Sequence, residues 1–242
     1  DQSTISNHST NGVLTSGIVT VTRSTFYNNQ SGDGGGLFAA SGAQVWIANS
    51  TFSHNAATSG YGGALVTAAS VTVDPSITVV NSTFVANTAR NLGAAIREFR
   101  GTITVGNSIF SGHSGSLVCM SNSSAGNNIS STSDCGGGSG SQTDTDAKLT
   151  PLGNYGGATQ TYALSADSPA VDAGNASTCA DTLVNNLDQR GIARPQGAGC
   201  DIGAFESNVT VNPTSLSSVV ENNLFPTSAF TASGGSAPYS YM

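Results

Sequence analysis

The sequence predicts an all-β protein: a parallel β-helix (solenoid) of about five coils, followed by a loop-rich C-terminal extension that contains disulfides. The first observation is a phrase close to Asn-Ser-Thr-Phe, which recurs at intervals of 21 to 32 residues through the first half of the chain. Such recurrence is typical of a solenoid, in which one supersecondary unit stacks on the next. The aligned final positions are Ile5, Phe26, Phe52, Phe84 and Phe110.

The second observation is a pair of apolar columns in register with the aromatic one. Seven and five residues before each phenylalanine stands Val or Ile, with one residue between them. Alternation with a period of two places these side chains on one face of a strand. The pairs are Val19 and Val21, Val45 and Ile47, Ile77 and Val79, and Ile103 and Val105.

The other elements of each unit follow in order. The serine two residues before each aromatic is expected to bond the serine of the adjacent coil or a backbone carbonyl. The third residue after each aromatic is expected to form a corner, because asparagine tolerates left-handed backbone conformations. A second apolar stretch follows glycine-rich bends, where backbones can pass closely. These positions are Ser3, Ser24, Ser50, Ser82 and Ser108; His8, Asn29, Asn55, Asn87 and His113; and Leu37, Leu65 and Ile96.

A β-sandwich is the alternative architecture, because it also shows turn signals at regular spacing. We prefer the solenoid, since a sandwich does not repeat the same residue types at the same offsets. The longest interval, between Phe52 and Phe84, is explained by a loop near residues 70–75, which a stack tolerates. Helix is disfavoured throughout, because the chain holds 30 glycines and few good helix formers.

Composition and charge argue against several classes of function. Only 9% of residues are charged and the net charge is -7, so the surface would repel phosphate backbones and we expect no nucleic-acid partner. No run of 18 apolar residues occurs, so we expect no membrane span.

The four cysteines indicate disulfides. Cys119 and Cys135 form one local pair in the sequence, and Cys179 and Cys200 form another. Four cysteines allow three pairings, and buried free thiols are the alternative to any of them. Disulfides would place the protein in an oxidising, extracellular or cell-surface setting.

Residues that could carry catalysis do not gather in the predicted coil. The acids Asp33, Asp74 and Glu98 lie in different coils, whereas a glycosidase needs two carboxylates facing each other. The histidines His8, His54 and His113 are interpreted as solvated corner residues rather than as a metal site, and single Gly-Asp or Asp-x-Asp motifs do not make one. We therefore expect no catalytic residues, no metal and no cofactor.

One charged cluster stands out on the coil: Arg97, Glu98, Phe99 and Arg100. An exposed charged turn explains it, and the alternative is a contact with an acidic glycan. In the second half, Asp188-Gln189-Arg190 and Asp201 are interpreted as a structural clamp, since arginine can fork onto a carboxylate.

The second half carries recognisable motifs. The segments 151–161, 168–174, 188–195 and 200–206 resemble the choice-of-anchor Q region of secreted bacterial proteins, and the Asn-Ser-Thr-Phe units resemble polymorphic outer-membrane protein repeats. The resemblance implies a right-handed parallel β-helix and a secreted or surface-displayed bacterial protein, and it implies no activity. Residues 209–213 and 231–241 resemble the opening strands of an immunoglobulin-like repeat.

The expected domains are a coil at residues 1–113, a region closing the solenoid at 114–207, and a linker with incomplete immunoglobulin-like strands at 208–242. We expect neighbouring subunits or further segments of the same protein to cover the strand edges before Asp1 and after Met242. The predicted function is a non-enzymatic, extracellular structural or adhesive protein within a surface-displayed or filament-forming assembly that contacts cell-surface glycans. The alternative is a β-helix that binds or cleaves polysaccharide, as a lyase or glycosidase does.

Overall fold

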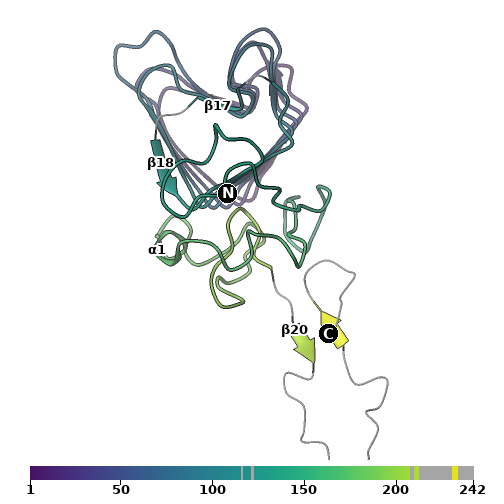
Figure 1. The fold of residues 1–242 in the computed structure, drawn as a ribbon. Coiled ribbons are helices and arrows are strands. Elements are labelled where there is room, and N and C mark those ends of the chain that lie inside the picture. The colour runs from purple at the N-terminus through teal and green to yellow at the C-terminus, as the bar shows by residue number, and fades with distance from the viewer. Residues whose placement is uncertain (116, 121–122, 208–209, 213–230, 234–242) are drawn as a thin grey trace, which may run out of the picture.

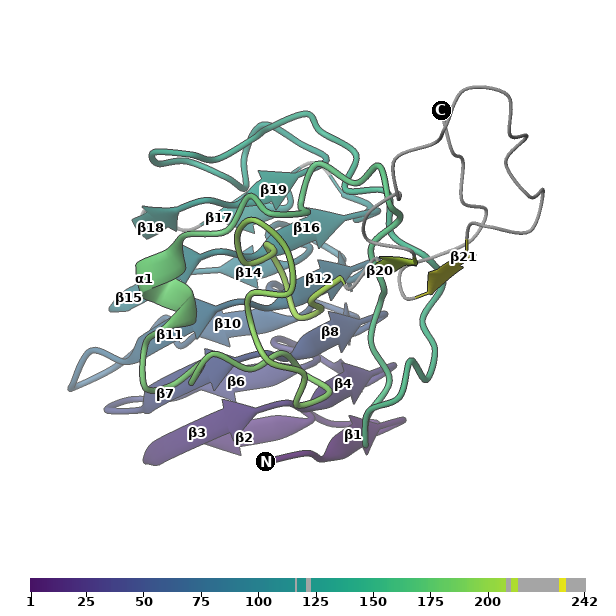
Figure 2. The ribbon, with the colours of Figure 1, turned by 90° about the horizontal axis from the view of Figure 1, so that it is seen from below.

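The computed structural model describes residues 1–115, 117–120, 123–207, 210–212 and 231–233. It confirms the parallel β-helix: three sheets form the sides of a triangular tube, and the chain passes through each sheet once per coil (Figure 1; Figure 2). Sheet A consists of β1 (Thr4–Ser6), β4 (Thr25–Tyr27), β8 (Thr51–Ser53), β12 (Thr83–Val85), β16 (Ile109–Ser111) and β19 (Ile129–Ser130).

The other sheets have the same stacked, parallel order. Sheet B consists of β2 (Val13–Thr15), β6 (Leu37–Ala39), β10 (Leu65–Thr67), β14 (Ile96–Arg97) and β17 (Cys119–Met120). Sheet C consists of β3 (Ile18–Thr22), β7 (Gln44–Ala48), β11 (Ser76–Val80), β15 (Thr102–Gly106) and β18 (Ser123–Gly126). A small sheet D is formed by β5 (Gln30–Ser31), β9 (Ala56–Ala57) and β13 (Thr88–Ala89).

The predicted columns fill the interior of the tube. Phe26, Phe52, Phe84 and Phe110 are buried, and their rings stack in sequence with centroids 4.4, 5.1 and 4.9 Å apart. The Val and Ile columns of sheet C and the Leu and Ile column of sheet B join them in one core cluster. Because each coil places similar apolar residues at the same position along its strands, they stack on one another, and one repeated pattern is enough to build a continuous core.

The serines behave as predicted. The Ser50 hydroxyl accepts a hydrogen bond from the backbone N–H of Ser24 and donates to the carbonyl of Ala48. Ser82 and Ser108 repeat this arrangement one and two coils later. Each buried hydroxyl is therefore satisfied by the adjacent coil and by its own strand.

The prediction for the asparagines was wrong in its position. The residues with positive φ lie one place earlier, at Asn28, His54 and Ala86 among others. Asn29, Asn55 and Asn87 are instead fully buried and form a ladder inside the corner. Each side chain donates to a carbonyl of the preceding coil, and those of Asn29 and Asn55 also donate to Oδ1 of the asparagine in the next coil.

His113 continues this ladder, which corrects its interpretation as a solvated corner residue. Its Nδ1 accepts a hydrogen bond from the backbone N–H of Asn87, and its Nε2 is buried without a hydrogen-bond partner in the described part of the chain. Desolvation lowers the pKa of His113 to about 4. His8 and His54 are exposed, as a solvated corner requires.

The coil continues past residue 113 for one more turn, with one strand in each of the three sheets. Strands β17, β18 and β19 stack on the preceding coil, and Ile129 and Ser130 pair with Ile109 and Phe110. Asn128 occupies the position that Ser50, Ser82 and Ser108 have in earlier coils, since its Oδ1 accepts a hydrogen bond from the backbone N–H of Ser108. Substitution at the aromatic and serine positions hides this turn from the sequence repeat.

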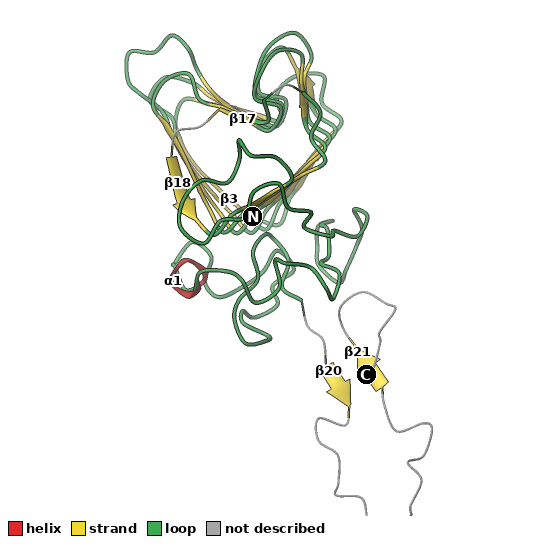
Figure 3. Cartoon of the chain, viewed as in Figure 1, coloured by secondary structure: helices red, strands yellow, loops and turns green. Residues whose placement is uncertain are grey.

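The extension after this turn is loop apart from one helix in the described residues, α1 (Ala176–Cys179) (Figure 3). It returns along the outer face of sheet A and buries it. Two disulfides are present, Cys119–Cys135 and Cys179–Cys200, and they leave no free cysteine. Among the residues described, no helix is long and apolar enough to span a bilayer.

The region assigned to immunoglobulin-like strands lies mostly outside the described residues. Within it, β20 (Thr210–Asn212) and β21 (Thr231–Ser233) pair antiparallel.

Candidate functional site

The outer face of sheet C carries a row of polar side chains and one tryptophan. In β3, β7, β11 and β15 the residue between the two apolar core positions points outward. Strand pairing places Trp46 beside Thr20 on one side and Thr78 on the other. Thr20 is exposed, and Trp46 and Thr78 are partly exposed.

A groove of about 500 Å³ lies between this face and the extension. One wall is sheet C, with Thr20, Trp46, Thr78 and Val80, and the other is the segment 181–183. This volume falls within the range of roughly 300 to 1,000 Å³ that small-molecule sites occupy. The groove crosses three adjacent strands, which at about 4.8 Å per coil gives it a length of roughly 10 Å.

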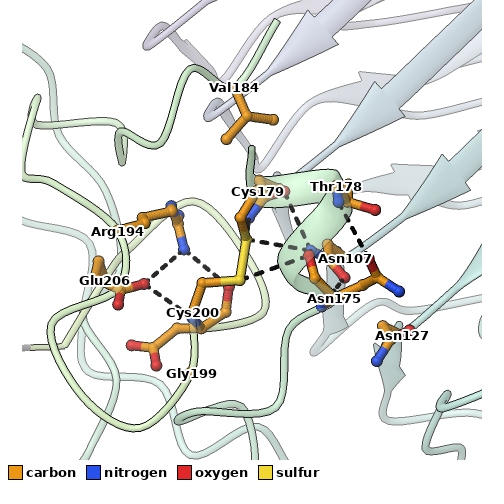
Figure 4. The surroundings of a disulfide bond; sticks show 12 residues. Asn107, Asn127, Asn175, Thr178, Cys179, Val184, Arg194, Gly199, Cys200 and Glu206 are labelled. Atoms are coloured by element: carbon orange, nitrogen blue, oxygen red, sulfur yellow. Dashed lines mark hydrogen bonds and ion pairs between the residues drawn. A yellow bond between two sulfur atoms is a disulfide. The ribbon is translucent and has the colours of Figure 1, made fainter. Parts of the chain in front are cut away.

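The wall formed by residues 181–183 is held by helix α1, which precedes it directly. The Asn175 side chain caps α1 by accepting from the backbone N–H groups of Ser177 and Thr178. Asn175 is in turn fixed to the coil, because its backbone N–H donates to Oδ1 of Asn107 at 2.9 Å (Figure 4). The wall therefore has a defined position against sheet C.

Two further contacts hold the same wall. The disulfide from Cys179, the last residue of α1, ties it to Cys200 (Figure 4). The Asn49 side chain donates to the carbonyl of Val184, just past the wall, at 3.2 Å. Asn49 and Asn107 are the asparagines of two Asn-Ser-Thr-Phe phrases, so the repeat itself supplies the anchors.

A buried charge cluster of residues on both sides of Cys200 in the sequence also fixes the extension. Arg194 and Glu206 form an ion pair of 2.9 Å with both side chains fully buried, and Arg190 pairs with Asp188 at 2.6 Å. Desolvation raises the pKa of Glu206 and lowers that of Arg194. The structural clamp expected from Asp188 and Arg190 is present, whereas the Asp201 carboxylate accepts from backbone N–H groups and forms no arginine fork in the described residues.

The groove combines three kinds of group. Trp46 offers an aromatic face, Thr20, Thr78 and Thr182 offer hydroxyls, and Asp181 offers a carboxylate. Oδ1 of Asp181 accepts from the backbone N–H of Leu183 at 2.8 Å, which orients the carboxylate. An aromatic face beside hydroxyl and carboxylate acceptors suits a ligand with an apolar ring face and a rim of hydroxyl groups, which is the chemistry of a sugar.

The charged cluster at residues 97–100, interpreted as an exposed charged turn with a glycan contact as the alternative, separates in the structure. Arg97 lies over the ring of Phe99, 4.3 Å from its centroid. Glu98 turns away and accepts from the backbone N–H of Ile103 at 2.7 Å, and Arg100 forms an exposed ion pair with Asp74 at 3.5 Å. Only Arg97 and Phe99 therefore remain together as a candidate contact.

No protein-family model, curated protein or solved structure matches this chain. The resemblance to choice-of-anchor Q regions and to polymorphic outer-membrane protein repeats stays a prediction.

Sequence reasoning missed Trp46 and Asp181. A signal for Trp46 was present, since the one tryptophan of the chain stands between Val45 and Ile47, at the outward position of a strand. For Asp181 there was none, because its place opposite Trp46 depends on the path of the extension over sheet A. No group of three or more His, Cys, Asp or Glu side chains able to hold a metal occurs among the described residues.

Proposed function

We propose that this protein is a non-enzymatic, extracellular structural and adhesive protein that binds neutral glycans in the groove beside Trp46. The observation that carries the proposal is the groove itself: Trp46 and two threonine hydroxyls lie on a wall of stacked strands, and one oriented carboxylate, Asp181, faces them from the anchored segment 181–183. Sites built on regular elements hold their geometry better than sites on loops.

An extracellular setting is supported by the cysteines, since all four are paired and disulfides persist in oxidising compartments. A structural role within a surface-displayed or filament-forming assembly is supported by the solenoid, whose stacked coils present long, flat faces. Negative-stain microscopy of native material separates a filament from a monomer.

A binding role without cleavage is supported by the carboxylates. Asp181 is the one carboxylate among the described residues that line the groove, whereas glycoside hydrolysis uses two. In the coil, Asp33 accepts from the backbone N–H of Tyr61, Asp74 pairs with Arg100, and Glu98 accepts from the backbone N–H of Ile103. A reducing-sugar assay and an unsaturated-product assay test the alternative of a polysaccharide-cleaving β-helix.

The deciding experiment is a glycan array followed by calorimetry with the best neutral ligand. Trp46→Ala is expected to weaken binding by at least about tenfold, because it removes the stacking face. Phe38→Ala is the matched control: it removes a partly exposed ring from sheet B and should leave affinity unchanged. Equal losses in both variants, or no neutral ligand for the native protein, would contradict the proposal.

A further inference from the structure

Sheet B carries a cation in an otherwise apolar outward column. In register along the stack, the outward positions are Leu14, Phe38, Val66, Arg97 and Met120. Leu14 is exposed, Val66 is fully buried, and Phe38, Arg97 and Met120 are partly exposed. A guanidinium loses part of its hydration among apolar neighbours. This costs free energy unless surrounding groups stabilise the charge, so the position of Arg97 calls for a structural or a functional reason.

Aromatic rings flank this guanidinium on two sides. Its central carbon lies 4.3 Å from the centroid of Phe99 and 5.5 Å from that of Tyr61. The two rings stand edge to face, 5.0 Å apart with an interplanar angle of 81°. Cation–π contact stabilises the positive charge and leaves its hydrogen-bonding capacity unused.

The hydrogen bonds of Arg97 are far from satisfied. Its side chain makes one hydrogen bond in the described residues, from Nη1 to the Met120 sulfur at 2.6 Å, and sulfur is a weak acceptor. Nε is buried and has no hydrogen-bond partner among the residues that the structure describes. Arg97 takes part in none of the ion pairs formed within the part of the chain that the structure describes. Nε is too buried to reach a ligand, so the donors that remain for one are N–H groups of the two terminal nitrogens.

Side chains of other coils hold the backbone that carries the two rings. The backbone N–H of Tyr61 donates to Asp33 at 2.7 Å, and that of Phe99 donates to the Thr67 hydroxyl at 3.0 Å. The Tyr61 hydroxyl has no hydrogen-bond partner in the described residues. A fixed cation beside two fixed rings is a preorganised site.

We propose that Arg97, Tyr61 and Phe99 form a second binding site, which takes the carboxylate of an acidic sugar. A planar guanidinium matches a planar carboxylate, with two parallel N–H···O bonds. The rings supply the surface on which the apolar side of the sugar rests, and the Tyr61 hydroxyl supplies a bond to a sugar hydroxyl. The site lies on sheet B, so it does not depend on the groove of sheet C.

The test is a calorimetric titration of the full chain with a galacturonic acid trisaccharide. Arg97→Met is expected to weaken binding by at least about tenfold, since a charge-assisted pair is lost. Arg100→Met is the matched control: it makes the same change in charge three residues away, at an exposed ion pair, and should alter affinity by less than about twofold. Melting temperatures of both variants establish that they are folded.

Two further measurements define the ligand. Neutral galactotriose and inorganic sulfate should each compete at least about tenfold less well than the acidic trisaccharide. Trp46→Ala should keep its affinity for the acidic sugar, which separates this site from the groove of the proposed function. The proposal is overturned if the native protein does not bind the acidic trisaccharide, if Arg97→Met and Arg100→Met weaken binding equally, or if sulfate competes as well as the sugar.

Discussion

The hydroxyl of Thr51 donates a hydrogen bond of 2.7 Å to Oε1 of Gln189, a residue 138 positions later in the chain. Thr51 is the threonine of an Asn-Ser-Thr-Phe phrase, and it points outward while Phe52 points into the core. The amide nitrogen of Gln189 lies 3.0 Å from the Thr25 hydroxyl, one coil away. In the coil that follows Thr51, the Thr83 hydroxyl accepts a hydrogen bond from the backbone N–H of Ala204. The repeated threonines thus form the docking line for the extension.

We expect Gln189→Leu to lower the free energy of unfolding by about 3 kcal/mol, because it removes one hydrogen bond each from the buried hydroxyls of Thr25, Thr51 and Thr159 and from the carbonyl of Gln160. Urea denaturation measures the change. The control is Gln30→Leu, an exposed glutamine on the coil, which should stay within about 0.5 kcal/mol of the native protein. A loss shared by both variants would show that the docking line is not what Gln189 stabilises.

Acid should destabilise the coil through His113. Its pKa in the folded protein is lowered to about 4, chiefly by desolvation, while the unfolded chain keeps a value near 6.5. Between these values the unfolded state binds more protons, so this contribution is fully present above pH 6.5 and is lost as the pH falls to 4. The loss amounts to about 3 kcal/mol.

The test substitutes the residue that the ladder uses elsewhere. In His113→Asn, the new side chain would accept from the backbone N–H of Asn87 as an asparagine does one coil earlier, and it does not titrate. Unfolding free energies measured from pH 7.5 to 4 should therefore fall less steeply in this variant. His8→Asn, at an exposed position, should follow the native curve. Parallel curves for all three proteins would refute the assignment.

The asparagine ladder should be costly to interrupt. Asn55→Ala removes bonds to the carbonyl of Phe26, to Oδ1 of Asn87 and to the backbone N–H of Asn29, all in a fully buried corner. We expect a loss of about 3 to 5 kcal/mol in unfolding free energy. Asn91→Ala, at an exposed asparagine, should cost less than about 1 kcal/mol. Thermal or urea unfolding followed by circular dichroism compares the two.

The sequence was sufficient to predict the coil because its information is local and repeated. Phe26, Phe52 and Phe84 recur at matched offsets, so their stacking follows from strand periodicity alone. The roles of Asn55 and its equivalents were harder to predict, because left-handed corners and buried ladders both favour asparagine. The residue one place earlier has the positive φ, and there the types vary.

The candidate groove was beyond prediction for a different reason. Its sheet wall could have been inferred from Trp46, but its other wall depends on where the extension docks. That docking rests on pairs such as Thr51 with Gln189, which are separated by more than a hundred residues and follow no repeated spacing. Both disulfides did join the local cysteine pairs, although spacing alone left three pairings open.

The two disulfides should differ in their effect on the groove. Cys179–Cys200 anchors α1 and hence the wall at residues 181–183, whereas Cys119–Cys135 crosses the last turn of the coil. Each bridge closes a short loop, so either double alanine variant should lose about 3 kcal/mol of stability.

Only removal of Cys179–Cys200 should also weaken neutral-glycan binding, by about fivefold or more, because a wall with more freedom must be ordered when the ligand binds. Calorimetry on both double variants, at a temperature where circular dichroism shows each to be folded, makes the comparison. Equal affinities would mean that the Asn49 bond to Val184 and the Asn107 bond to Asn175 hold the wall unaided. An equal loss in both would show that the coil as a whole, rather than the anchored wall, sets the geometry of the groove.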